Sequence, residues 1–510
     1  MTNNITFVSS VIDEWPTEFS TAQVYLFIDD YITYQKIHDL IPDNCINKNP
    51  GHKLDLILRE IEDELVNLDE LAFSGKFYSS WLASSFAESN PYRSDFFLNV
   101  CRAIFLVREI PKNSRVVIVI ENIILGEALR QIFKNRGCES SWIGGETKKL
   151  SIRYYSLAKT MLSAIFYAIK YKIIYKTKKI KKYSNPDILL LSWVGENHFS
   201  KNNLIDHSPY FGSLPKWIRE KYSNLTWLAS PINWAGNHKT IEDNIKHAVD
   251  SVIPLHGLVS FIGIFKALVN WLCFPLAIKK NIKILGVNIS PLVRLEVVNE
   301  MSSPQIINAC LFSNAAKSLK AAEFDPKILI YTFENQPWEK ILIKSFRKEF
   351  SNIYIIGNQT APFSELYLSG FPTKKQWEDG SAPDKLVVVG DRAKARFIGF
   401  GASEERIVVG GSLRLNFTSV NQSLIKADLA FENVLVSCPI EAIDSLELIS
   451  KSIESFRDLG CKIRINFHPA SDKDLTKEII KRTLEYFGQD RIEFTNKLAV
   501  ELFKATDLVA

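Results

Sequence analysis

The chain has 510 residues, of which 46% are hydrophobic and 23% charged, so it contains enough apolar material for two or three buried cores. Its 62 basic residues nearly balance its 57 acidic ones, and the net charge of +5 therefore identifies no class of partner. The 7 cysteines form no Cys-x-x-Cys pair, which argues against a disulfide framework and a zinc site, and residues 1–30 lack the pattern of a secretory signal peptide. We expect reduced thiols and a cytoplasmic protein.

The N-terminal part alternates between strand and helix patterns. Apolar runs at residues 24–28 and 116–120 have the length and β-branched content of buried strands. Helical periodicity covers residues 54–71, which carry an acidic face, and residues 125–134. We predict an N-terminal α/β region over residues 1–150.

Residues 151–183 differ in character and are predicted to form a basic amphipathic helix and linker. Apolar side chains recur there at helical spacing, but the apolar part is too short and too interrupted to span a bilayer. Lysines accumulate without an acidic residue: Lys170, Lys172, Lys176, Lys178, Lys179, Lys181 and Lys182. Such a segment binds to an anionic membrane surface, or it is a surface helix followed by a solvated linker.

Residues 253–276 raise the same alternatives, because apolar side chains crowd together there. His256, Lys266 and Asn270 interrupt the run, so we predict a monotopic or buried helix and not a transmembrane one. Together the two segments predict one membrane-facing surface and a peripheral location on the inner face of the plasma membrane.

From residue 184 onwards, strands and helices alternate regularly. Strands are predicted at residues 188–191, 225–228, 282–287, 328–331, 353–356, 386–389 and 406–409. This alternation predicts a Rossmann-like domain with a parallel sheet over residues 184–415. The composition then turns polar, and a second Rossmann-like domain is predicted over residues 416–510.

The loop from Thr332 to Glu339 is the most informative stretch of the first of these domains. It follows a buried strand, and in open α/β sheets ligands bind at the carboxyl ends of the strands. A helix over residues 338–350 follows it. The loop combines two carboxylates, amides, a proline and a tryptophan, which predicts a functional site: Glu334, Gln336, Pro337, Trp338 and Glu339.

In the last domain, a predicted strand at residues 434–436 ends at Ser437, and a second one at residues 462–467 delivers His468 and Pro469 at its carboxyl end. Residues 507–510 have the pattern of the beginning of another buried strand. With only about half of the strands that such a sheet needs, we expect this domain to be truncated.

These features resemble the two-domain GT-B glycosyltransferases of bacterial surface carbohydrate synthesis, which make capsule, lipopolysaccharide or O-antigen. The resemblance rests on the run from Pro383 to Asp391, the run from Gly401 to Ser412, and the strand-end pair His468-Pro469. It is greatest to transferases of CMP-activated keto-sugars, such as Kdo and sialic acid transferases. It covers roughly residues 187–510.

The resemblance implies an inverting glycosyltransferase that moves a sugar from a nucleotide sugar to a glycan or lipid-linked acceptor. Glu334 matches the general base, with Glu339 as the second candidate, and a carboxylate in a partly apolar cleft suits that task. The expected donor-binding residues are His468, Pro469, Ser437, Gly411 and Arg414. Gln336, Trp338 and Gln359 are expected to form the acceptor loop.

Other functions remain open at this point. A phosphotransferase that uses CDP-glycerol or CDP-ribitol has a similar layout, and a non-catalytic, membrane-docked assembly subunit is an alternative of another class. Both carboxylates also suit the start of a helix, where the helix dipole stabilises negative charge. We expect no cofactor and no metal, because Asp472-Lys473-Asp474 has the pattern of a helix cap and no histidine cluster has ligand spacing. No nucleic-acid motif is found, so nucleic acid is not an expected partner.

Overall fold

The computed structural model describes residues 4–48, 50–90, 93–110, 115–143, 154–175, 186–222, 224–232, 237–364, 367–413, 432–488, 491–495 and 508–509. It is an α/β protein whose main sheets are built from parallel strands, as predicted. The chain forms two compact units that do not follow chain order. Unit 1 comprises Met1–Gly51, Arg108–Lys148 and Thr418–Ala510, and unit 2 comprises His52–Val107 and Lys149–Phe417.

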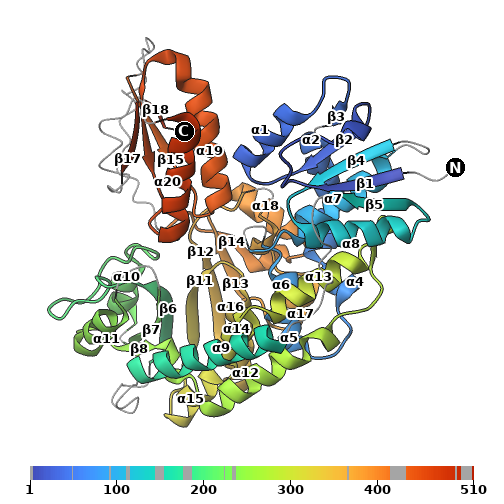
Figure 1. The fold of residues 1–510 in the computed structure, drawn as a ribbon. Coiled ribbons are helices and arrows are strands. Elements are labelled where there is room, and N and C mark those ends of the chain that lie inside the picture. The colour runs from blue at the N-terminus through green and yellow to red at the C-terminus, as the bar shows by residue number, and fades with distance from the viewer. Residues whose placement is uncertain are drawn as a thin grey trace. The chain divides into compact units, whose positions relative to one another are not determined.

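Unit 1 contains a five-stranded parallel sheet with the order β3-β2-β4-β1-β5. Its strands are β1 (Asn4–Ser9), β2 (Gln23–Phe27), β3 (Ile46–Lys48), β4 (Arg115–Ile120) and β5 (Glu139–Ile143), and its helices include α1 (Tyr31–Leu40) and α8 (Ile123–Lys134) (Figure 1). The sequence predicts β2, β4 and α8 correctly but misses β1, which lies between β4 and β5.

A second parallel sheet in unit 1 has the order β17-β16-β15-β18. It consists of β15 (Asn433–Ser437), β16 (Lys462–Asn466), β17 (Ile492–Thr495) and β18 (Leu508–Val509), with helices α19 (Ala442–Phe456) and α20 (Lys473–Phe487). The strand expected at the end of the chain is confirmed, because β18 pairs with β15. Asp30, which caps α1, receives two hydrogen bonds from Arg482 of α20, and Ile32 packs into the core of this second sheet.

Unit 2 is built on a seven-stranded parallel sheet with the order β14-β13-β12-β11-β6-β7-β8. Its strands are β6 (Ile188–Val194), β7 (Leu225–Pro231), β8 (Val252–Pro254), β11 (Ile328–Phe333), β12 (Tyr354–Gln359), β13 (Lys385–Val388) and β14 (Ile407–Val409). In chain order, the strands from β6 to β8 extend the sheet in one direction, and the strands from β11 to β14 extend it in the other. The strand order therefore reverses between β6 and β11, and in such sheets the crevice for a ligand lies at this switch point.

The segment at residues 282–287 differs from the prediction of a strand in the parallel sheet. Lys283–Ile284 (β9) and Val287–Asn288 (β10) form a small antiparallel hairpin of their own, with Gly286 in its turn at φ +76°. Strand periodicity alone does not distinguish a hairpin arm from a sheet strand.

The helices of unit 2 surround this sheet (Figure 1). They include α10 (Leu214–Lys221), α11 (His238–His247), α12 (Phe261–Cys273), α13 (Ser290–Met301), α14 (Gln305–Cys310), α15 (Ala315–Ala321), α16 (Pro337–Glu349), α17 (Lys374–Glu378) and α18 (Asp391–Gly399). The helix predicted after the polar loop is confirmed as α16, and Pro337 at its first position fits a helix start.

Residues 52–107 pack in unit 2, although the sequence groups them with the N-terminal strands. They form α2 (Gly51–Glu60), α3 (Glu62–Val66), α4 (Leu68–Ala72), α5 (Tyr78–Leu82), α6 (Ser85–Glu88) and α7 (Phe96–Glu109). Side-chain contacts hold them there: Arg396 binds Glu62 through two hydrogen bonds of 3.2 Å, and the buried Lys340 Nζ donates to the carbonyl of Ala87. The domain boundaries at 150, 183 and 415 remain predictions.

The basic segment begins with the predicted helix, α9 (Tyr154–Ile174). The lysines from 176 to 182 lie outside the described residues. The apolar run at residues 253–276 contains the end of β8, two short 3-10 turns and α12. Within the described part of the chain, no helix has both the length and the apolar character needed to cross a bilayer.

Candidate functional site

The switch point of the unit 2 sheet brings two tryptophans together. Trp193 lies near the carboxyl end of β6, and Trp338 lies in the first turn of α16, after β11. Their ring centroids are 5.2 Å apart, and Phe312 extends the aromatic contact, with its ring 6.0 Å from Trp338. Trp193 and Trp338 are each partly exposed, so an aromatic wall lines this edge of the sheet. The sequence predicts Trp338 but not Trp193.

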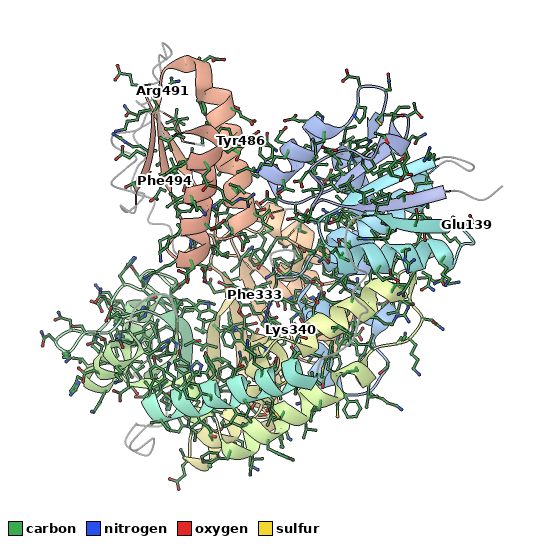
Figure 2. The ribbon with its side chains drawn as sticks, viewed as in Figure 1. Glu139, Phe333, Lys340, Tyr486, Arg491 and Phe494 are labelled. Atoms are coloured by element: carbon green, nitrogen blue, oxygen red, sulfur yellow. The ribbon has the colours of Figure 1, made fainter. Side chains whose placement is uncertain are left out.

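The loop after β11 begins at Glu334 and not at Thr332. The strand continues through Phe333, which pairs in register with Gln359 of β12. The side chain of Phe333 is fully buried and packs on Phe397, with ring centroids 5.9 Å apart, so it does not border the site. Figure 2 shows Phe333 and Lys340 within unit 2. Trp338 is therefore the aromatic residue of the predicted loop that borders the site.

Asn335 gives the loop its sharp turn. Its φ of +57° lies in the left-handed region, which asparagine tolerates better than most residues. The side chain is buried, and its Nδ2 donates a hydrogen bond of 2.9 Å to the carbonyl of Ser369. The turn at Asn335 and its hydrogen bond to Ser369 together fix the direction of the loop next to Glu334.

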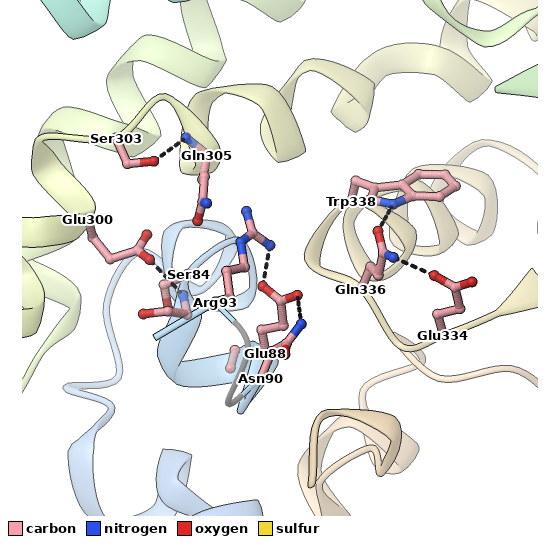
Figure 3. Close-up of polar contacts among 12 residues, drawn as sticks. Ser84, Glu88, Asn90, Arg93, Glu300, Ser303, Gln305, Glu334, Gln336 and Trp338 are labelled. Carbon is pink, nitrogen blue, oxygen red and sulfur yellow. Dashed lines mark hydrogen bonds and ion pairs between the residues drawn. The ribbon is translucent and has the colours of Figure 1, made fainter. Parts of the chain in front are cut away.

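A chain of side-chain hydrogen bonds orients the carboxylate of Glu334. Trp338 Nε1 donates to Gln336 Oε1 at 2.6 Å, and Gln336 Nε2 donates to Glu334 Oε2 at 2.5 Å (Figure 3). Glu334 and Gln336 are both partly exposed. Three residues that the sequence assigned to the site are thus joined in one network, with the carboxylate at its end.

Glu339 lies in a different environment. Its side chain is buried, and Oε2 accepts a hydrogen bond of 3.2 Å from the backbone N–H of Glu334. Burial raises the pKa of Glu339 well above its ordinary value, and the negative charge of Glu334 raises it further. Burial also raises the pKa of the nearby Tyr367 to about 12, so its phenol is neutral. The two carboxyl groups of the loop therefore differ: Glu339 is buried, and its raised pKa favours the protonated form, whereas Glu334 reaches solvent.

Lys340 is a member of the site region that the sequence does not reveal. It is only 1% exposed, and Nζ donates to the carbonyl of Ala87 at 2.5 Å. Burial lowers the pKa of Lys340 to about 8, although the carboxylates of Glu88, Glu339 and Asp69 oppose this shift. Its neighbours on α16, Glu339 and Ile341, are also buried, but only the structure shows this burial, so no sequence signal marks Lys340.

A cavity of about 300 Å³ opens beside the neighbouring strands β12 and β13. Its lining includes Gln359, Phe363, Gly390, Arg392 and Phe397. Gln359 Oε1 accepts a hydrogen bond from the backbone of residue 389, but Nε2 is buried without a hydrogen-bond partner among the described residues. The cavity thus combines aromatic surface, a positive side chain and an amide donor, which suits a polar ligand with hydroxyl or acidic groups.

The C-terminal sheet of unit 1 carries the other predicted residues. His468 follows β16, and its Nδ1 accepts a hydrogen bond of 3.0 Å from the backbone N–H of Ala470. The neutral ring then carries its hydrogen on Nε2, which is a donor. Ser437 ends the neighbouring strand β15, is exposed, and pairs in register with Asn466. His468 and Ser437 thus lie at the carboxyl edge of one sheet, and Pro469 is exposed beside His468.

The remaining predicted residues have simpler settings. Gly411 follows β14 with φ +72°, a left-handed conformation that favours glycine, and Arg414 lies outside the described residues. Asp472 caps α20 by accepting hydrogen bonds from the backbone N–H groups of Asp474 and Leu475, as predicted. Among the described residues, no group of three or more histidine, cysteine, aspartate or glutamate side chains has the arrangement of a metal site.

Comparison with known proteins identifies no relative: the chain matches no family model and no curated protein sequence.

Proposed function

We propose that the protein is an inverting glycosyltransferase of the GT-B type, with Glu334 as its catalytic base and His468 as a nucleotide contact. The observation that carries the proposal is the carboxylate of Glu334, which is held by Gln336 and Trp338 at the switch point of the unit 2 sheet. Open α/β sheets bind their ligands at this position. The resemblance of residues 187–510 to transferases of CMP-activated keto-sugars supplies the reaction class.

In this proposal, Glu334 takes the proton of the acceptor hydroxyl while the oxygen forms a bond to the anomeric carbon of the donor. The bond between that carbon and the phosphate oxygen breaks, and the nucleotide leaves with the electron pair. Glu339 stays protonated and holds the backbone of Glu334 through its hydrogen bond of 3.2 Å, so it is a positioning residue. The aromatic wall of Trp193 and Trp338 provides the apolar side of the site.

We assign the cavity beside β12 and β13 to part of the acceptor. Gln359 lies there, one strand away from β11, and its amide N–H, which has no partner among the described residues, suits a sugar hydroxyl or a carboxylate. His468 donates from Nε2 to the nucleotide, and Ser437 is a second contact at the same sheet edge. The favoured donor is a CMP-linked acidic sugar such as Kdo or a nonulosonic acid.

The test is the release of free nucleotide from a CMP-linked acidic sugar by the full chain, with nucleotide binding measured by calorimetry. Glu334→Gln keeps the shape and removes the base, so turnover is expected to fall by about 10²-fold or more while CMP binding is kept. The matched control is Glu378→Gln, an exposed position of the same unit, which keeps full turnover. Full turnover in Glu334→Gln would refute the base assignment.

A second variant tests the nucleotide contact. Loss of one hydrogen bond to a charged phosphate in His468→Ala is expected to weaken CMP binding by about 1 to 3 kcal/mol, with less effect on turnover at saturation. Binding of UDP or GDP in place of CMP would refute the donor class. A chain that bound CDP and transferred a glycerol or ribitol phosphate would be the phosphotransferase. If the chain bound no nucleotide at all, the proposed enzymatic function would be refuted and the alternative of a non-catalytic assembly subunit would be favoured.

A further inference from the structure

Helix α9 carries an apolar stripe on its outer face. Leu162, Phe166, Ile169 and Ile173 follow one another at spacings of three and four residues, so they share one side of the helix. All of them are exposed, and Phe166 is 69% exposed. An amphipathic helix of a globular protein normally presents polar side chains on this side.

Helix α12 repeats the arrangement. Its exposed stripe consists of Phe261, Ile262, Phe265, Val269 and Leu272, and Leu276 continues it beyond the helix. Phe261 is 70% exposed and Phe265 is 66% exposed. Isolated apolar side chains are common on protein surfaces, but contiguous ones of this size mark an interaction site.

The two helices are neighbours in unit 2, and Figure 1 shows them running alongside one another. Lys172 of α9 connects the stripes, because its Nζ lies 5.7 Å from the ring centroid of Phe261 and donates to the carbonyl of Val259. The stripes of α9 and α12 together are called the apolar face below.

The opposite sides of both helices are firmly packed. Ala164 and Ala168 of α9 are buried, and Tyr175 donates to or accepts from His238 Nδ1 at 2.7 Å. On α12, Ala267 and Trp271 are buried. Each helix therefore has a buried side that packs within unit 2 and an exposed side that carries its stripe.

The charged side chains within the two segments have one sign. The sequence contains no aspartate or glutamate in residues 151–186 or 251–295. Exposed lysines flank the stripes on both helices and just after α12: Lys159, Lys170, Lys266, Lys279 and Lys280. A surface of exposed aromatic and aliphatic side chains with these lysines beside it complements an anionic lipid bilayer.

We propose that the apolar face docks the protein on an anionic phospholipid membrane, with α9 and α12 lying in the plane of the interface. The aromatic and aliphatic side chains of both stripes enter the headgroup and acyl boundary, while the lysines contact lipid phosphates. This inference does not depend on the proposed catalytic reaction, because it rests on the surface of two helices and on no residue of the candidate site.

The experiment is co-sedimentation of the full chain with vesicles of phosphatidylcholine, with and without phosphatidylglycerol. The protein is expected to bind the anionic vesicles and to be released as the salt concentration rises. The double variant Phe166→Gln with Phe265→Gln is expected to lower the affinity by about tenfold or more, because each exposed ring loses its insertion. Lys170→Gln with Lys266→Gln should weaken binding to the anionic vesicles alone.

The matched control is Leu204→Gln with Tyr354→Gln, which changes two exposed apolar positions outside the apolar face and leaves binding unchanged. Equal loss in this control, or no vesicle binding by the wild-type chain, would overturn the proposal. Sedimentation velocity without lipid tests the other occupant, a second copy of the chain. The proposal would also be overturned if the wild-type chain formed a dimer and bound no vesicles, and if the Phe166→Gln with Phe265→Gln variant were monomeric.

Discussion

The buried carboxyl group of Glu300 provides a quantitative test of unit 2. This residue of α13 accepts a hydrogen bond of 3.2 Å from the backbone N–H of Ser85, and its other oxygen has no hydrogen-bond partner among the described residues. One turn earlier, Glu296 accepts a hydrogen bond of 2.5 Å from the hydroxyl of Ser85. Burial raises the pKa of Glu300 from 4.5 to about 7, and the neighbouring Glu296 adds to the shift.

The sign of the pH effect follows from this pKa. Between pH 4.5 and 7 the folded protein retains a proton on Glu300 that the unfolded chain has lost, so the free energy of unfolding decreases as pH rises. Each pH unit costs about 1.4 kcal/mol, and the total is about 3 kcal/mol at pH 8. Glu300→Gln stays neutral and still accepts the hydrogen bond from Ser85, so it avoids this loss.

We therefore expect Glu300→Gln to match the wild-type chain at pH 5 and to exceed it at pH 8. For a unit of this size, about 3 kcal/mol corresponds to a rise in Tm of roughly 4 °C, which differential scanning fluorimetry measures. Glu220→Gln, an exposed position of α10, is the control and should leave both melting temperatures unchanged. A variant that is less stable than wild type at pH 8 would show that Glu300 is ionised and stabilised by its surroundings.

Two further predictions concern single positions in each unit. In unit 1, burial raises the pKa of Asp30 but hydrogen bonds from Arg482 and the cap outweigh this, so its pKa is lowered and its contribution is lost as pH falls below about 4. Asp30→Asn should cost about 1 to 3 kcal/mol in urea unfolding at pH 7 and progressively less as the pH falls below about 4; a loss that does not shrink at low pH would contradict the role of its charge. In unit 2, Asn335→Ala should be less stable than Asn335→Gly by about 1 kcal/mol, because both lose the bond to Ser369 but only alanine is strained at φ +57°. Equal stability of the two variants would remove strain as the reason for asparagine there.

Apolar runs located the strands that are buried on both faces, as β4 and β11 illustrate. Strand β1 escaped prediction because Thr6 and Ser9 interrupt its apolar residues, although both are buried. Thr6 Oγ1 is satisfied by a hydrogen bond of 2.9 Å with Ser141 of β5. A polar residue with a partner far away in the chain is as compatible with a core as an apolar one, and no local pattern reveals that partner.

The candidate site shows the same limit. The carboxylate loop was predictable because its residues are consecutive, and the hydrogen bonds that orient Glu334 join positions two residues apart. Trp193 and Lys340 were not, since their roles depend on the adjacency of β6 with β11 and on helices drawn from residues 52–107. Periodicity reports which face of a strand is buried but not which strand lies beside it.

The interrupted path of the chain through unit 1 has a consequence for synthesis. The core that Ile32 shares with α19 and α20 needs residues that leave the ribosome more than 400 positions after it. At about 5 to 20 residues per second, α1 is synthesised on the order of 20 to 90 s before this partner, and Asp30 lacks its hydrogen bonds from Arg482 during that time. Unit 2, which ends at Phe417, can assemble during that interval, so the core that α1 shares with α19 and α20 is among the last to be completed.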